Sequence, residues 1–133
     1  MIDISVGALK NLVIAVAHGT VTGEDYEKVL IPALQAKLET QKKIRLLYHL
    51  DKDFTGFTAG AMWDDAKFGL GHLTAFEAIA IVTDVVWITD AVKLFGFFLR
   101  CPVKVFGNNK LIEAEEWVTT TAWRALAEES ASW

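Results

Sequence analysis

The chain has 133 residues, 53% of them hydrophobic, and a formal net charge of −4. This length and apolar content predict a globular chain with a sizeable core, which we assign to one domain over residues 1–126, followed by a frayed tail over 127–133. The acidic balance gives no general attraction to nucleic acids or anionic membranes, so we expect neither as a partner. The basic residues gather at 37–45, which is typical of a solvated helix end and its turn.

The single cysteine, Cys101, excludes an internal disulfide and suits a reducing cytoplasm. It has Pro102 beside it and no histidine or acid nearby in sequence, so we expect a small buried hydrophobic residue and not a nucleophile. No basic segment followed by an apolar one opens the chain, which predicts no export signal. The most apolar stretch, 78–99, is interrupted by charged residues, and we expect no membrane insertion and a cytoplasmic protein.

Two runs rich in β-branched residues begin the chain, at 2–7 and 11–21, and predict a hairpin or meander. The second run is apolar on both faces, with Val13, Ala15 and Ala17 on one and Ile14 and Val16 on the other. Such a pattern is typical of a strand that is covered on both sides.

A helix is predicted after Thr22, a plausible N-terminal cap with Asp25 three residues later. Its apolar stripe consists of Tyr26, Val29, Leu30, Ala33, Leu34 and Leu38. Pro32 lies within this stripe, so the helix must kink there or restart with Pro32 in its first turn.

The remaining patterns alternate between strand and helix. Strands are predicted at 43–51, 77–84 and 101–107, and helices at 85–99, at 111–128 and from 58 until Gly69 or Gly71 ends the helix. The order β-β-α-β-α-β-α-β-α predicts an α/β fold with a mixed, mostly parallel five-stranded sheet flanked by helices.

Several segments, in this order along the chain, resemble the SpoIIAA-like family: "GEDYEKVLIPALQAKL", "IRLLYHL", "AMWDDAKFGLGHLTAFEAIAIVTDVVWI", "VKVF" and "IEAEEWV". These small bacterial proteins are related to the STAS domains of anti-sigma-factor antagonists, and their fold is similar to that of CRAL-TRIO lipid carriers. The resemblance covers about residues 13–118. It implies a five-stranded mixed sheet with flanking helices and brings no established reaction or cofactor.

Ligands of open parallel sheets meet the crevice outside the carboxyl ends of the strands. Two predicted loops leave such ends, and their side chains are expected to share one surface, which we call the strand-end rim: Asp51, Asp53, Thr55, Gly56, Thr83, Asp84 and Trp87. Each loop leads into a helix whose free amides could bind an anion, but the aspartates disfavour a highly charged phosphate ligand.

In STAS antagonists, a hydroxyl in an Asp-Ser-Ser/Thr-Gly turn is phosphorylated. "DFTG" has Asp53, Thr55 and Gly56 at matching positions, so the resemblance implies Thr55 as a candidate phosphorylation site, although Phe54 replaces a small residue. A phosphate there would add negative charge beside Asp53. The alternative is structural: Asp53 or Thr55 caps a turn and Gly56 supplies backbone freedom.

His49 and Asp51 are two apart on a strand and could form an acid–base or metal pair. No third ligand accompanies them at a suitable spacing, and His18 and His72 stand alone near element ends. A structural histidine is therefore the favoured interpretation, and we predict no metal, no cofactor and no catalytic residue.

Three tryptophans fit inward-facing positions and are expected in the core: Trp63, Trp87 and Trp117. Phe95, Phe97 and Phe98 cannot all face one core from a single helix, because consecutive positions turn about 100°. An exposed apolar patch would be a dimer interface or a ligand pocket, and Trp123 favours the dimer.

The leading hypothesis is a non-catalytic, STAS-like interaction or regulatory module that forms a homodimer and binds another protein through the strand-end rim. The alternative is a binder of a small hydrophobic ligand or lipid in a CRAL-TRIO-like pocket.

Overall fold

The computed structural model describes residues 1–7, 9–72, 74–95 and 101–121. Its five strands form one sheet in the order β1-β2-β3-β4-β5. Their bounds are β1 Ile2–Val6, β2 Leu12–Val21, β3 Ile44–Phe57, β4 Phe76–Val82 and β5 Val103–Phe106. β1 is antiparallel to β2 and the other neighbours are parallel, which confirms the predicted α/β fold with a mixed, mostly parallel sheet.

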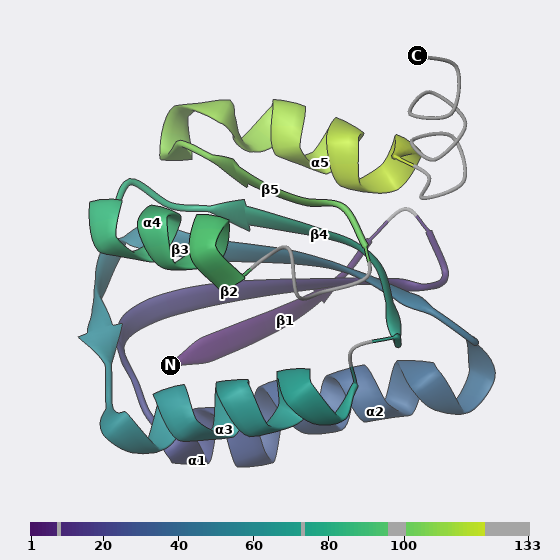
Figure 1. Ribbon diagram of the computed structural model, residues 1–133, viewed down its shortest axis with the longest axis horizontal. Helices are drawn as coiled ribbons and strands as arrows, with labels where there is room; N and C mark the ends of the chain where they lie inside the picture. Colours follow the sequence, from purple (N-terminus) through teal and green to yellow (C-terminus); the bar gives the residue numbers. More distant parts are fainter. Residues whose placement is uncertain (8, 73, 96–100, 122–133) are drawn as a thin grey trace.

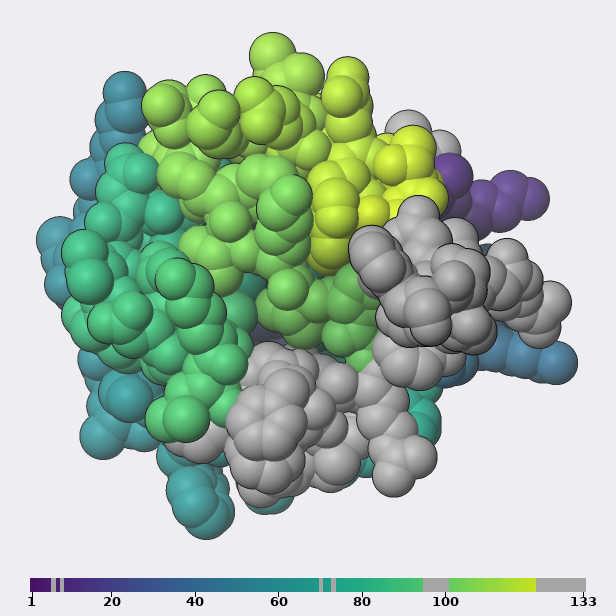
Figure 2. Space-filling view, turned by 45° about the horizontal axis from the view of Figure 1, so that its top comes forward, coloured from purple at the N-terminus to yellow at the C-terminus, as the bar shows by residue number. Residues whose placement is uncertain are grey.

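Helices cover the two faces of the sheet unequally (Figure 1). The helical segments are α1 Gly23–Asp25, the π-helical η1 Tyr26–Leu30, α2 Ile31–Thr40, α3 Ala59–Gly71, α4 Val86–Phe95, the short η3 Asn108–Lys110 and α5 Leu111–Thr120. In Figure 1, α1, α2 and α3 lie below the sheet and α5 lies above it. Figure 2 shows α5 and α4 on either side of the segment that contains β5.

The first helical region confirms the predicted capping and the predicted break. The Thr22 side chain accepts a hydrogen bond from the Asp25 N–H, and the Asp25 carboxylate accepts one from the Thr22 N–H at 2.8 Å. The chain then widens into η1, and Pro32 lies in the first turn of α2. Proline has no N–H to donate, so the change of helix type falls where a regular α-helix would lose a bond.

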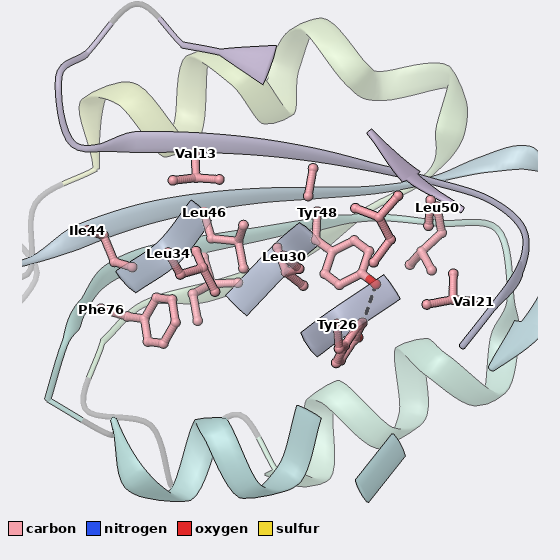
Figure 3. Packing of buried hydrophobic residues seen from close by; sticks show 14 of the residues in the cluster. Val13, Val21, Tyr26, Leu30, Leu34, Ile44, Leu46, Tyr48, Leu50 and Phe76 are labelled. Atoms are coloured by element: carbon pink, nitrogen blue, oxygen red, sulfur yellow. Dashed lines mark hydrogen bonds between the residues drawn. The ribbon is translucent and has the colours of Figure 1, made fainter. Parts of the chain in front are cut away.

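The main core lies between the sheet and the α1–α3 layer (Figure 3). Val13, Ala15 and Ala17 of β2 point into it, as predicted. Tyr26 of η1 meets Tyr48 of β3, and their hydroxyls are 3.0 Å apart. One hydrogen bond therefore links the two buried hydroxyls inside this mostly apolar layer.

A smaller core lies under α5, where Ala114 and Val118 pack against Leu47 of β3 and Ala80 of β4. Among the described helices, only α5 has buried side chains in this second core, and it approaches β3 and β4 more than the β1 end. α5 therefore covers the part of this face that β3 and β4 form.

Arg45 contradicts the prediction that the basic segment is a solvated end, because only 7% of this residue is exposed. Its Nε donates to Glu77 at 2.8 Å, and its Nη1 donates to the carbonyls of Val118 at 2.7 Å and Thr121 at 2.5 Å. The guanidinium thus binds free carbonyls at the end of α5, where a cation is favoured. The backbone of Thr121 is extended, so the helix predicted over 111–128 ends earlier than expected; residues 122–133, including the predicted tail, lie outside the described residues.

Candidate functional site

The carboxyl end of β3 and the start of α4 lie at the same end of the sheet (Figure 1). The rings of Phe57 and Trp87 meet edge to face, with their centroids 6.4 Å apart. The two segments that were expected to form the strand-end rim are therefore neighbours in space.

The segment Asp53–Gly56 forms no turn, contrary to the prediction. It belongs to β3, which continues to Phe57 and pairs with β2. The helix cap is supplied later, by Thr58, whose hydroxyl accepts a hydrogen bond from the Ala61 N–H at 3.2 Å. Neither Asp53 nor Thr55 caps a turn, because β2 offers the backbone partners that keep this segment extended.

A register shift between β2 and β3 explains the arrangement of the acidic side chains. Ala17 pairs with Leu50, but Gly19 pairs with Phe54, so one residue of β2 faces three residues of β3. The single residue is His18, and Gly19 after it has a φ of 57°, which glycine adopts readily.

His18 consequently contacts two carboxylates of β3. Its Nδ1 lies 3.0 Å and 3.1 Å from the two carboxylate oxygens of Asp53 and 3.6 Å from Asp51 Oδ2. Its Nε2 lies 3.5 Å from Asp3 Oδ2 on β1. One ligand atom from each of His18, Asp51 and Asp53 lies within 4.8 Å of the other two, a separation that a metal ion can bridge. The expectation that His18 stands alone is therefore wrong.

His49 is joined to the Asp84 corner through Asn108, a residue that the sequence analysis missed. His49 Nε2 lies 2.8 Å from Asn108 Oδ1 and 4.0 Å from Asp51 Oδ1. Asn108 donates from its backbone N–H to Asp84 at 2.9 Å and from its side chain at 3.2 Å. These two hydrogen bonds hold the pKa of Asp84 below its ordinary value, because they stabilise the charged carboxylate. These contacts connect Asn108, at the start of η3, to His49 on β3 and to Asp84 after β4.

The other predicted rim residues differ in exposure. Thr83 is only 3% exposed and its hydroxyl accepts a hydrogen bond from the Val85 N–H, so it is a structural residue and not part of an exposed surface. Thr55 is exposed, and its hydroxyl lies 2.9 Å from that of Thr20 on β2. Gly56 has a φ of 149°, a value that a residue with a side chain rarely adopts.

Large apolar side chains are exposed where α4 begins. Val86 is 73% exposed and Trp87 is 50% exposed. Trp63 on α3 is also exposed, at 69%, so the prediction that Trp63 and Trp87 belong to the core is wrong. Trp117 does pack against the smaller core, as predicted. The periodic patterns placed these tryptophans on apolar faces, but α3 and α4 leave parts of those faces uncovered.

Most residues of the predicted dimer or ligand patch lie outside the described residues. Phe95 is the last residue of α4, whereas Phe97, Phe98 and Trp123 lie outside the described residues.

Cys101 is buried, as predicted, and burial raises the pKa of its thiol to about 11. Such a thiol is mostly protonated near neutral pH and is a poor nucleophile. None of the described helices is both long and apolar enough to cross a lipid bilayer.

The architecture defines a small α/β domain in which one mixed sheet lies between helical layers and polar side chains gather at one end. The family model described as SpoIIAA-like matches residues 12–119. The chain belongs to the SpoIIAA-like family, which confirms the resemblance seen in its sequence.

A solved structure from Shewanella loihica PV-4 is similar to this chain over 88% of its length and 93% of the other chain. It is described as an uncharacterized protein of the DUF3478 family with a SpoIIAA-like fold; the TM-score is 0.73 and the sequence identity is 27%. A comparison with curated proteins gave no match. These likenesses agree on the fold and assign no reaction.

Proposed function

We propose that the protein is a non-catalytic interaction module that forms a homodimer and binds a protein partner through the strand-end rim. The observation that carries this proposal is the exposure of Val86 and Trp87 at the same end of the sheet as the carboxylates of Asp51, Asp53 and Asp84. Exposed apolar side chains next to charged ones are typical of protein interfaces, where aromatic residues contribute much of the binding energy.

The charges of this surface indicate the chemistry of the partner. Asp53 and Asp84 are both exposed, and the lowered pKa of Asp84 keeps it ionised well into acid. A partner with lysine or arginine around an apolar contact would complement this surface, and the complementarity would raise its rate of association at low salt.

Sedimentation equilibrium at tens of micromolar tests self-association with a matched pair of variants. We place the dimer interface on the exposed apolar side chains at the start of α4, so Val86→Asp puts a charge into it, whereas Ile112→Asp puts the same charge near the start of α5; the two parent residues are each 73% exposed. Both new carboxylates lie in the first turn of a ten-residue helix, where they are tolerated, so both variants should fold. We expect a dimer for the wild type and for Ile112→Asp, and a monomer for Val86→Asp.

A strictly monomeric wild type would reject the homodimer.

Mass spectrometry of an organic extract of the purified protein tests the alternative function, the binding of a small hydrophobic ligand or lipid. A stoichiometric co-purified lipid would favour a hydrophobic-ligand binder over the interaction module.

Phosphorylation of Thr55 would regulate this interaction. A phosphate there would add up to two negative charges near Asp53 and would disturb the contact between the hydroxyls of Thr55 and Thr20. Thr55→Glu should therefore weaken binding of an acidic partner surface and strengthen that of a basic one, relative to Thr55→Val, which removes the hydroxyl without adding charge.

A further inference from the structure

Carboxylates surround the ring of His18, whereas the nearby α-amino group of Met1, which donates to the His18 carbonyl at 2.9 Å, forms its ion pair with Asp25. Carboxylates face both ring nitrogens, with Asp51 and Asp53 at Nδ1 and Asp3 at Nε2. Within the described ranges, every ion pair of these three aspartates is with a histidine, and no lysine or arginine lies within ion-pairing distance of them.

A neutral imidazole has a proton on only one nitrogen, so its other nitrogen directs a lone pair outward. Here that lone pair would face a carboxylate whichever nitrogen has the proton. A cation on Nδ1 removes this repulsion while Nε2–H donates to Asp3; that cation is either a second proton, which gives an imidazolium with an N–H toward each carboxylate, or a metal ion. A metal ion can supply that cation, and its binding at Nδ1 would release the proton that otherwise forms the contact with Asp53.

The distances are close to those of a coordination shell. Two nitrogen or oxygen ligands about 2.1 Å from one ion lie roughly 3.0–3.4 Å apart in octahedral or tetrahedral geometry. The separations from Nδ1 to the nearest oxygens of Asp53 and Asp51 are 3.0 Å and 3.6 Å. Small rotations of exposed carboxylates suffice to complete the arrangement.

The contact between Asp3 and Nε2 of His18 resembles that of a residue that orients a metal ligand without binding the ion itself. Histidine ligands commonly donate their second N–H to a carboxylate, which fixes the ring orientation and strengthens the ligand. Asp3 lies 3.5 Å from Nε2 and comes from β1, the strand next to β2. Three strands and one register shift thus supply both the ligands and the group that orients them.

We propose that His18, Asp51 and Asp53 bind a divalent transition-metal ion, with Asp3 as a positioning residue. One nitrogen and two carboxylate ligands suit Zn²⁺, Co²⁺ or Mn²⁺ better than Ca²⁺ or Mg²⁺, which prefer oxygen alone. The side chain of Asp53 is 62% exposed, so water can complete the shell. The metal site is independent of the proposed docking function, because ion binding can be measured in the absence of any protein partner.

The test is calorimetric titration of tag-free, chelator-treated protein with ZnCl₂. We expect one saturable equivalent of Zn²⁺. His18→Gln and Asp53→Asn should each weaken the affinity at least about tenfold, and Asp3→Asn about tenfold, as outer-shell changes do. His72→Gln is the matched histidine control; His72 bonds to the Phe68 carbonyl at the end of α3 and should leave the affinity unchanged.

Nitrogen chemical shifts of the histidine rings give a second readout, since Zn²⁺ should shift Nδ1 of His18 while Nε2 stays protonated. Absence of saturable binding would overturn the proposal, and so would Zn²⁺ binding of equal affinity in wild type, His18→Gln and Asp53→Asn. Sedimentation in the presence of chelator measures the oligomeric state without metal, so the metal site and the homodimer can each be rejected independently of the other.

Discussion

The hydroxyls of Tyr26 and Tyr48 lie 3.0 Å apart inside the main core and join the π-helical segment to the longest strand (Figure 3). Tyr26→Phe or Tyr48→Phe would leave one buried hydroxyl without this partner. We expect each variant to lower the free energy of unfolding by about 1–2 kcal/mol, measured by urea denaturation. The double variant should cost less than the sum, because it removes both polar groups together; strictly additive effects would show that the hydroxyls are not coupled.

The same two residues are the only tyrosines in the chain, so the increase in absorbance at 295 nm that accompanies tyrosinate formation comes from them alone. Burial raises the pKa of both hydroxyls, and the nearby carboxylate of Asp65 adds to the effect at Tyr26. Above pH about 10 the unfolded chain releases these protons while the folded chain retains them, so the free energy of unfolding should fall as the pH rises. Tyrosinate should appear only with unfolding; a native titration near pH 10 would contradict this.

Arg45 should be the most sensitive position of the basic segment. Arg45→Met removes the bond to Glu77 and the hydrogen bonds that the guanidinium donates to the carbonyls of Val118 and Thr121. We expect a loss of roughly 3 kcal/mol in the free energy of unfolding, by urea denaturation. Lys43→Met, an exposed neighbour two residues earlier, is the control and should change stability by less than about 0.5 kcal/mol. Equal effects would show that the contacts of Arg45 contribute little.

Cys101 should resist modification in the native protein. With a thiol pKa of about 11, only about one molecule in a thousand is ionised at pH 8, and the residue is buried as well. A disulfide reagent such as DTNB should therefore react stoichiometrically in urea and hardly at all without it. Fast stoichiometric reaction with the folded chain would mean that this thiol is accessible.

The fold was predictable because its signals are local. The capping pair Thr22 and Asp25 is three residues apart, and Pro32 marks the change from η1 to α2 within the same segment. Alternation of strands and helices then leaves few topologies, and the observed order β1-β2-β3-β4-β5 is one of them.

The candidate site was only partly predictable, because its contacts join distant segments. His49 and Asn108 are 59 residues apart, and His18 meets Asp53 only because β2 and β3 shift register between them. Hydrophobic periodicity identifies a strand but contains no information on such a shift. Likewise, the apolar spacing that includes Trp87 identifies one side of a helix but does not show whether another element covers it.

β3 is 14 residues long, but its described pairing with β4 ends at His49. Beyond that point only β2 provides backbone partners, so the far part of the strand is a two-stranded ribbon attached to a five-stranded body. Amide hydrogens in such a ribbon can exchange through local openings that need less free energy than global unfolding. The carboxylates of Asp51 and Asp53 therefore lie on a section of the sheet that is held by fewer strand neighbours than the rest of β3, where small adjustments around a bound ion or protein disturb fewer backbone hydrogen bonds.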